Sequence, residues 1–265
     1  MNKFDKVRGD FLDSKILLGG NREVYRIGDH VRRIAKPWSK SVLRFLRHLE
    51  NDGLPVEHIV SLNENFEISA FVEGEMVHPN KWSDNALYKI GKMLSKLHTS
   101  SRGFKLQDDD IWQDWFLRHV GKAEQICCHG DIAPWNVITE NGHPKVLLDW
   151  EMAGPADPFA ELARVCWLFV QLFDDDLQAM HNLPSPKKRA EQVRIIADAY
   201  GLTADMRKGL VGKIIEVIIC ETALEEAVKP AITFDSVGNL WGFAWRIRSL
   251  HWVWRHQDVL KNALK

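Results

Sequence analysis

One short stretch indicates both the fold and the chemistry of this chain: His129-Gly130-Asp131-Ile132-Ala133-Pro134-Trp135-Asn136. Apolar runs at 126–128 and 137–139 lie on either side of it and are expected to be short strands. The polar residues between them would therefore sit on a loop held by a rigid scaffold, where catalytic groups are commonly placed. Asp149 follows a further apolar strand, expected over 145–148.

Asp131, Asn136 and Asp149 are residue types that phosphoryl transfer requires. A carboxylate orients the attacking hydroxyl and accepts its proton. The charge on the β- and γ-phosphates calls for Mg²⁺, a hard ion that prefers oxygen ligands. The three residues could instead be structural, two as turn formers and Asp149 as a helix cap. Their order, each after an apolar strand, favours the functional interpretation.

The order His-Gly-Asp, four residues and Asn, followed by Leu147-Leu148-Asp149-Trp150-Glu151, resembles the aminoglycoside phosphotransferase and choline kinase superfamily. These proteins are small-molecule relatives of the protein kinases. The longer segments 128–136 and 149–158 are similar to the bacterial phosphotransferase-enzyme group within it. The resemblance spans roughly residues 15–170. It implies an α+β, two-lobed, protein-kinase-like fold.

The resemblance also implies roles for the loop residues. Asp131 would be the catalytic base, and Asn136 and Asp149 would bind Mg²⁺. The phosphate donor would be ATP or GTP. His129 is expected to brace the loop through hydrogen bonds, because a lone His is weak evidence for acid or base chemistry.

Two further acids follow the expected metal ligand. Asp157, after Gly154-Pro155, resembles the family's buried Asp that ties the metal loop to the next helix. Glu151 is open to two interpretations: a carboxylate near the metal or the substrate, or an exposed acid at the end of a strand.

The chain divides into a β-rich lobe, 1–74, and a mainly helical lobe, 75–265. The first lobe is expected to hold a five-stranded sheet and one helix, with Ser39 as its N-cap and Gly53 as its stop. Strands are predicted at 15–18, 23–27, 30–35, 59–62 and 66–72. Helices are predicted at 82–98, 111–120 and 240–260, and almost throughout from 157 onward.

The nucleotide is expected in the first lobe. Gly19-Gly20-Asn21 forms a turn whose backbone N–H groups could approach phosphates. Family members carry a Lys or Arg on the third strand, and strand alternation selects Arg33, on the face of Val31. Lys36 is set aside because it lies at the strand end, next to Pro37.

Two more expectations concern this lobe. Protein kinases pair the strand cation with a helix Glu, but residues 39–52 offer no Glu on the core face, so this ion pair is not expected. The resemblance suggests that the backbone of Ala70 and Val72 binds the purine base.

The acceptor is expected near the C-terminal helices. Trp241, Trp245, Trp252 and Arg248 fall roughly on one stripe of the helix expected over 240–260. Core packing with a solvated basic face is the favoured interpretation. The alternative is an aromatic wall for a bulky or cationic acceptor, which makes Trp245, Arg248 and Trp252 candidate acceptor residues. The positive local charge argues against a polycationic antibiotic.

The bulk properties exclude several classes of function. A net charge of −1 over 265 residues offers no case for a nucleic-acid or membrane partner, and neither is expected. The N-terminus lacks the apolar core of a signal peptide, and no run reaches the roughly 18 apolar residues of a spanning helix. The four cysteines match no zinc pattern. We therefore expect a cytoplasmic protein.

The leading interpretation is a kinase that transfers the γ-phosphate of a nucleotide to a hydroxyl of a small molecule. The alternative is a nucleotide-binding resistance or immunity protein of kinase fold that acts without phosphoryl transfer. A protein kinase is the weaker third choice, because no long activation segment follows Asp149.

Overall fold

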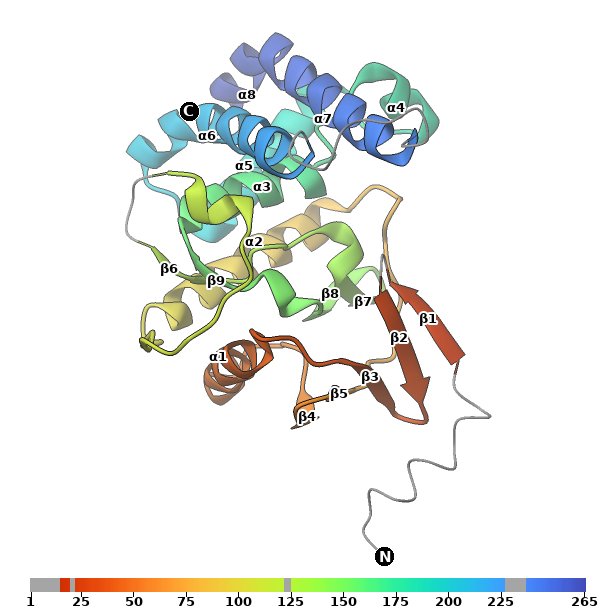
Figure 1. Ribbon diagram of the computed structural model, residues 1–265. Helices are drawn as coiled ribbons and strands as arrows, with labels where there is room; N and C mark the ends of the chain where they lie inside the picture. Colours follow the sequence, from red (N-terminus) through yellow and green to blue (C-terminus); the bar gives the residue numbers. More distant parts are fainter. Residues whose placement is uncertain (1–14, 20–21, 122–124, 227–236) are drawn as a thin grey trace, which may run out of the picture.

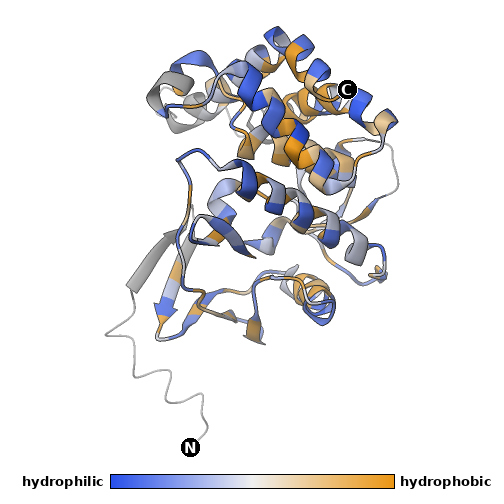
Figure 2. Ribbon diagram, turned by 180° about the vertical axis from the view of Figure 1, so that it is seen from behind, coloured by the Kyte–Doolittle hydropathy of each residue, from blue (hydrophilic) through white to orange (hydrophobic). Residues whose placement is uncertain are grey.

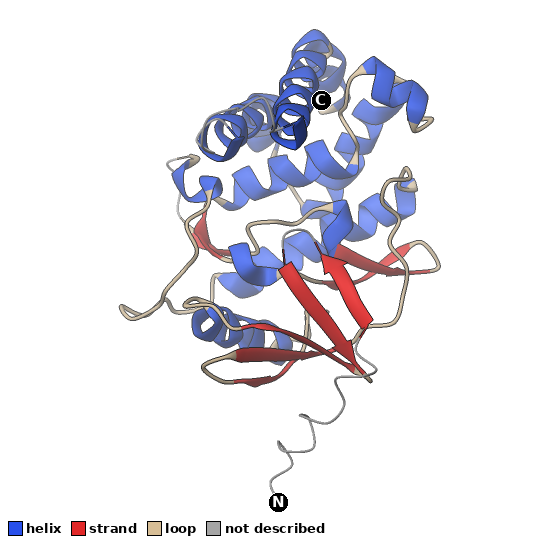
Figure 3. Ribbon diagram, turned by 45° about the vertical axis from the view of Figure 1, so that its right-hand side comes forward, coloured by secondary structure: helices blue, strands red, loops and turns tan. Residues whose placement is uncertain are grey.

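The computed structural model describes residues 15–19, 22–121, 125–226 and 237–265, and it has two lobes (Figure 1). A small sheet and one helix form the N-terminal lobe, and helices form most of the C-terminal lobe, as the colouring of Figure 3 shows. The predicted α+β kinase-like architecture is therefore confirmed. Between the lobes, Glu75 pairs with Thr139 as an isolated bridge, so the connecting segment runs beside the catalytic half of the molecule.

The sheet is antiparallel, in the order β1-β2-β3-β5-β4. Its strands are β1 (Lys15–Gly19), β2 (Arg22–Ile27), β3 (His30–Ile34), β4 (Ile59–Leu62) and β5 (Phe66–Ala70). All five strands were predicted. The last ends at Ala70 rather than at residue 72, because the chain leaves the sheet for the other lobe there.

Helix α1 (Ser39–Asn51) buries its apolar face, Val42, Phe45, Leu46 and Leu49, as its spacing predicts. Its N-cap is Trp38 rather than Ser39. The hydroxyl of Ser39 instead accepts a hydrogen bond from the backbone N–H of Lys36, 3.0 Å away, which fixes the turn that leads from β3. Gly53, with φ +73°, follows the helix end in the left-handed region where glycine is favoured.

The C-terminal lobe is built around α2 (Asp84–Ser101), capped by the hydroxyl of Ser83, with α2 against α5 and α3 against α6. Its other helices are α3 (Pro158–Phe169), α4 (Asp175–Met180), α5 (Pro186–Tyr200), α6 (Ala204–Glu221), η6 (Thr222–Glu226), α7 (Val237–Arg255) and α8 (Gln257–Ala263). Apolar residues gather between these helices (Figure 2). No helix in the described part of the chain is long and apolar enough to cross a membrane.

Two strand pairs carry the loops of interest on the side of this lobe that faces the N-terminal lobe (Figure 1). Strand β6 (Ile126–Cys128) pairs with β9 (Gly154–Ala156), and β7 (Val137–Glu140) pairs with β8 (His143–Leu147). The expected catalytic loop, residues 129–136, joins β6 to β7, and the expected metal loop, residues 148–153, joins β8 to β9. The two pairs therefore bring these loops to one place.

Two helix predictions were wrong. Residues 111–120 hold only a single turn, η3 (Phe116–His119), because tertiary hydrogen bonds hold the preceding chain extended: Ile111 N–H to Ser41 Oγ and Trp115 Nε1 to the carbonyl of Gly130, both 2.9 Å. The predicted long C-terminal helix is two helices, α7 and α8, that meet at His256.

Candidate active site

The catalytic loop is anchored by Gly130. Its φ is +86°, and a Cβ added there would lie 2.0 Å from the carbonyl oxygen of Met152, so only glycine lets the two loops approach this closely. Its N–H donates to Glu161 Oε1 at 2.5 Å, and its carbonyl accepts from Trp115 Nε1 at 2.9 Å. Both backbone groups are thus satisfied by the C-terminal lobe.

The carboxylate of Asp131 is held at both oxygens. Oδ1 lies 2.8 Å from Arg164 Nη1, and Oδ2 accepts from Asn136 Nδ2 at 3.0 Å. Burial raises the pKa of Asp131 above its ordinary value, and the guanidinium of Arg164 opposes that rise. With a fifth of its side chain exposed, Asp131 remains reachable from outside. A carboxylate so placed can accept a proton.

A backbone hydrogen bond brings the segments that carry Asn136 and Asp149 together. The Asn136 amide nitrogen is committed to Asp131, through the backbone carbonyl at 2.9 Å as well as the side chain, which leaves the amide oxygen for another partner. Leu148 N–H donates to the Asn136 carbonyl at 2.9 Å, so the next residue, Asp149, is brought to the same place. Two oxygen donors of this kind suit a hard cation such as Mg²⁺.

Asp149 adopts the left-handed conformation, with φ +61° and ψ +67°, a strained state that functional sites tend to hold. It is the N-cap residue of the short helix η5 (Trp150–Met152), but its side chain makes no capping hydrogen bond. The alternative interpretation of Asp149 as a helix cap is therefore right for its position and does not account for its side chain.

The contacts of His129 hold the loop in place. It is fully buried, its Nδ1 accepts from Asp131 N–H at 3.2 Å, and its Nε2 donates to the carbonyl of Leu148 at 3.0 Å. Its ring packs 4.2 Å from the ring of Trp150. Burial lowers the pKa of His129, which favours the neutral ring that this hydrogen-bond pattern needs.

Two residues of α3 that the sequence interpretation missed complete the loop. Glu161 binds Gly130 and also accepts from His98 Nε2 at 2.8 Å, and Arg164 binds Asp131. Both are buried. A signal was present in the sequence: they are the only charged residues of an otherwise apolar helix, and buried charges need partners.

Asp157 is buried and begins the helix that follows the metal loop, as the resemblance implied. It caps α3 by accepting from Phe159 N–H at 2.8 Å, and it lies 3.6 Å from Lys213 Nζ. A separate hydrogen bond, from the catalytic loop to α3, is made by Glu161.

Arg33 lies on the inner face of the sheet, as strand alternation predicts, whereas Arg32 lies on the other face over the ring of Phe66. The acids that pair with Arg33 do not come from helix α1. They are Glu57, which precedes β4, and Glu67 of β5 at 3.2 Å, and the sequence interpretation missed both.

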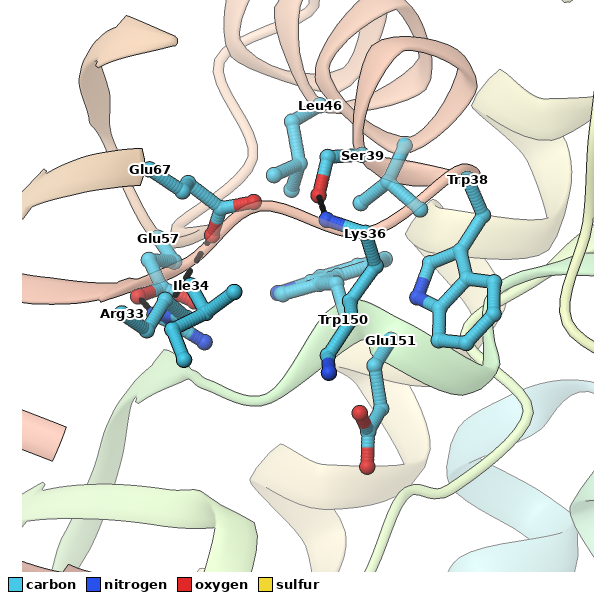
Figure 4. Close-up of a pocket in the computed structure, with 11 residues that line it drawn as sticks. Arg33, Ile34, Lys36, Trp38, Ser39, Leu46, Glu57, Glu67, Trp150 and Glu151 are labelled. Carbon is cyan, nitrogen blue, oxygen red and sulfur yellow. Dashed lines mark hydrogen bonds and ion pairs between the residues drawn. The ribbon is translucent and has the colours of Figure 1, made fainter. Parts of the chain in front are cut away.

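A pocket beside Arg33 is also lined by Lys36, which was set aside above, and by Trp150 and Glu151 of the metal loop (Figure 4). Residues of both lobes therefore meet here. Glu151 is half-buried at this pocket, so its interpretation as a fully exposed strand-end acid does not hold.

The structure describes only some of the other residues that were expected to bind the nucleotide. Gly19 ends β1 and pairs with Arg22, whereas Gly20 and Asn21 lie outside the described residues. The N–H of Ala70 donates to the carbonyl of His58 at 2.9 Å, so it is not available to a base, and this prediction was wrong for that group. Among the backbone hydrogen bonds of the described residues outside regular elements, none uses the N–H of Val72.

The aromatic stripe of α7 belongs mainly to the core, as favoured above. Trp252 is fully buried and stacks on Arg189, so it cannot contact an acceptor, and that candidate was wrong. Trp245 stacks on Trp167 with 5.1 Å between ring centroids. Arg248 pairs with acids around α4, Asp174 at 3.1 Å and Asp176 at 2.6 Å. The side chain of Trp241 lies outside the described residues.

Solved structures with similar folds are kinases of small molecules. An amicoumacin kinase superimposes with a TM-score of 0.68 at 11% identity, covering 97% of this chain and 94% of that one. A microcompartment-associated aminopropanol kinase gives 0.63 at 12% identity, covering 96% and 94%. A choline/ethanolamine kinase family protein from Mesorhizobium loti gives 0.57 at 16% identity, covering 98% and 99%. The fold is thus that of the small-molecule kinases.

Sequence comparison narrows the class to a family. Residues 101–209 match the model of the phosphotransferase enzyme family. The trifolitoxin immunity protein of Rhizobium leguminosarum bv. trifolii is 40% identical over 253 residues, which cover 93% of this chain and 96% of that protein. The chain belongs to the phosphotransferase enzyme family, and the resemblance drawn from its motifs is confirmed.

Proposed function

We propose that the protein transfers the γ-phosphate of ATP or GTP to a hydroxyl group of a small molecule, with Mg²⁺ as cofactor. The observation that carries this proposal is the arrangement around Asp131: a carboxylate held at both oxygens, beside the oxygen donors of Asn136 and Asp149. Phosphoryl transfer depends mostly on positioning and charge stabilisation, which such an arrangement provides.

In this mechanism the acceptor hydroxyl donates a hydrogen bond to Asp131, which takes its proton as the acceptor oxygen bonds to the γ-phosphorus. The bond from that phosphorus to the β,γ-bridging oxygen breaks, and ADP or GDP leaves. Asn136 Oδ1 and the Asp149 carboxylate would hold Mg²⁺, whose charge would offset the negative charge of the phosphates. Arg33 contacts the phosphates from the sheet, and its planar guanidinium suits that task. The backbone of Val72 receives the base.

The biological role that we propose is protection against a toxin by its phosphorylation. The support is the 40% identity, over nearly the whole length of both chains, with a trifolitoxin immunity protein. The same likeness favours a second candidate, in which the protein protects by binding nucleotide and a partner without transferring phosphate. The intact set of Asp131, Asn136 and Asp149 favours transfer.

One experiment separates the two candidates. Purified wild type and Asp131→Asn are incubated with labelled ATP or GTP, Mg²⁺ and a panel of hydroxylated metabolites, antibiotics and peptide toxins, while cells carrying each variant are challenged with the same toxins. Asp114→Asn, an exposed acid paired with His119, is the matched control. We expect transfer and protection to be lost together in Asp131→Asn only. Protection that survives without any transfer would establish the second candidate.

A further inference from the structure

The candidate base stands at one end of a chain of four charges that alternate in sign. Asp131 pairs with Arg164 of α3, Arg164 pairs with Glu221 at the end of α6, and Glu221 pairs with Arg246 of α7 at 3.0 Å. Arg164 and Glu221 are almost completely buried, with side-chain exposures of 4% and 2%. Burying charges costs free energy unless each is paired, and both Arg164 and Glu221 lie between two partners of opposite charge.

The guanidinium of Arg164 has one orientation in this network. Nε and Nη2 contact the two carboxylate oxygens of Glu221, at 2.9 and 3.3 Å, as a two-pronged pair. The remaining nitrogen, Nη1, is then aimed at Asp131 Oδ1, 2.8 Å away, and lies 3.5 Å from the carbonyl oxygen of Ile132. Glu221 therefore determines where Arg164 points.

Arg164 in turn limits how the carboxylate of Asp131 can rotate. Asn136 holds Oδ2 and Arg164 holds Oδ1, so rotation of the carboxylate breaks one contact or both. Asn136 is five residues away on the same loop, whereas Arg164 comes from a helix packed in the core. The second contact therefore ties the base to the rigid part of the lobe.

We propose that Arg164, oriented by Glu221, is a positioning residue that fixes the carboxylate of Asp131 toward the acceptor hydroxyl. This inference rests on the proposed function, because Arg164 is held to orient the base of that reaction. A purely structural ion pair would affect folding and leave the chemical step unchanged.

The test compares two buried arginines. Arg164→Met and Arg164→Lys are matched with Arg189→Lys, because Arg189 is equally buried but donates to the carbonyls of Gln171 and Phe173, away from the loop. Hydrolysis of ATP and GTP with Mg²⁺, water serving as acceptor, gives kcat and KM for the folded protein. Thermal unfolding gives the stability of each variant.

We expect Arg164→Met to lower kcat about 100-fold, the scale of a small misplacement of a catalytic group, with KM for the nucleotide nearly unchanged. Arg164→Lys should recover part of that loss, since it keeps the charge but cannot hold Glu221 and Asp131 together. Arg189→Lys should lower the unfolding temperature and leave kcat unchanged. An unchanged kcat in Arg164→Met would overturn the inference.

A second measurement does not depend on turnover. If wild type hydrolyses no nucleotide and phosphorylates no acceptor of the panel, the proposed function fails, and the position of the Asp131 carboxylate in a crystal structure of Arg164→Met still decides this inference. We expect the carboxylate to leave its wild-type position or to occupy more than one. A single, unchanged position would show that Arg164 does not orient it.

Discussion

The two lobes hold their functional charges in different ways. In the C-terminal lobe, the carboxylate of Asp131 is held by an amide and a guanidinium that leave it one orientation. In the N-terminal lobe, Arg33 is bound by two carboxylates, Glu57 and Glu67, so that a phosphate has to share the guanidinium with them. The base is thus organised before substrates arrive, whereas the cation is partly neutralised by its own lobe.

The largest effect is expected where the organisation of the catalytic loop is removed. Glu161→Ala leaves Gly130 N–H and His98 without their shared acceptor, and breaking a buried pair costs about 3–5 kcal/mol of unfolding free energy. Glu191→Ala, an exposed acid beside Lys188, is the control. Denaturant unfolding measures both, and equal stabilities would refute this role of Glu161.

Low pH should weaken the hydrogen bonds that the Glu161 carboxylate accepts from Gly130 and His98. Burial raises the pKa of Glu161, but the hydrogen bond and charge of His98 outweigh it, so the folded-state pKa lies below the ordinary value. The stabilisation is then complete above the unfolded-state pKa of about 4.3 and is lost as the pH falls through the folded-state pKa. Unfolding curves between pH 7 and pH 3 should show a smaller acid-induced loss in Glu161→Gln than in wild type.

Removing a metal ligand should come next. Asp149→Asn replaces a charged oxygen ligand with a neutral one. We expect the Mg²⁺ concentration that gives half-maximal turnover to rise by about 100-fold or more, since loss of a residue that only orients a metal ligand already costs about 10- to 100-fold in metal affinity. A magnesium titration of kcat/KM measures this change. An unchanged titration would remove Asp149 from the metal site.

The cation of the other lobe should matter less. Arg33 is already shared with two acids, so its loss should weaken nucleotide binding only moderately. We expect Arg33→Met to raise the nucleotide KM about tenfold, which is close to the effect of losing one charge-assisted hydrogen bond, with a smaller effect on kcat. Arg32→Met, on the opposite face of the same strand, should change neither. If Lys36→Met gave the larger effect, the phosphate-holding role would pass to Lys36, which lines the same pocket.

The smallest effect is expected at Arg248 of α7 and the acids with which it pairs near α4. Arg248→Ala removes half-exposed ion pairs to Asp174 and Asp176, and ion pairs exposed to solvent contribute little to stability. Thermal unfolding should move little, and nucleotide turnover should not change. A large loss of acceptor phosphorylation alone would restore Arg248 as an acceptor residue.

The sequence predicted local features well and long-range ones poorly. The strands, the face of Arg33 and the loop around Asp131 follow from alternation and spacing within a few residues. Glu161, Arg164 and Glu57 were missed because their partners are distant in sequence and only the fold brings them together. The predicted helix at 111–120 failed for the same reason, since contacts to Ser41 and Gly130 override its local preference.

The central claim is that Asp131 takes the proton of the acceptor during phosphoryl transfer. Its most direct test is single-turnover transfer from Mg²⁺-bound nucleotide by wild type and Asp131→Asn, with nucleotide affinity measured in parallel. We predict that affinity stays within about threefold while the chemical step slows by about 10²- to 10⁴-fold, the range for a lost general base. A chemical step of unchanged rate in Asp131→Asn would contradict the account.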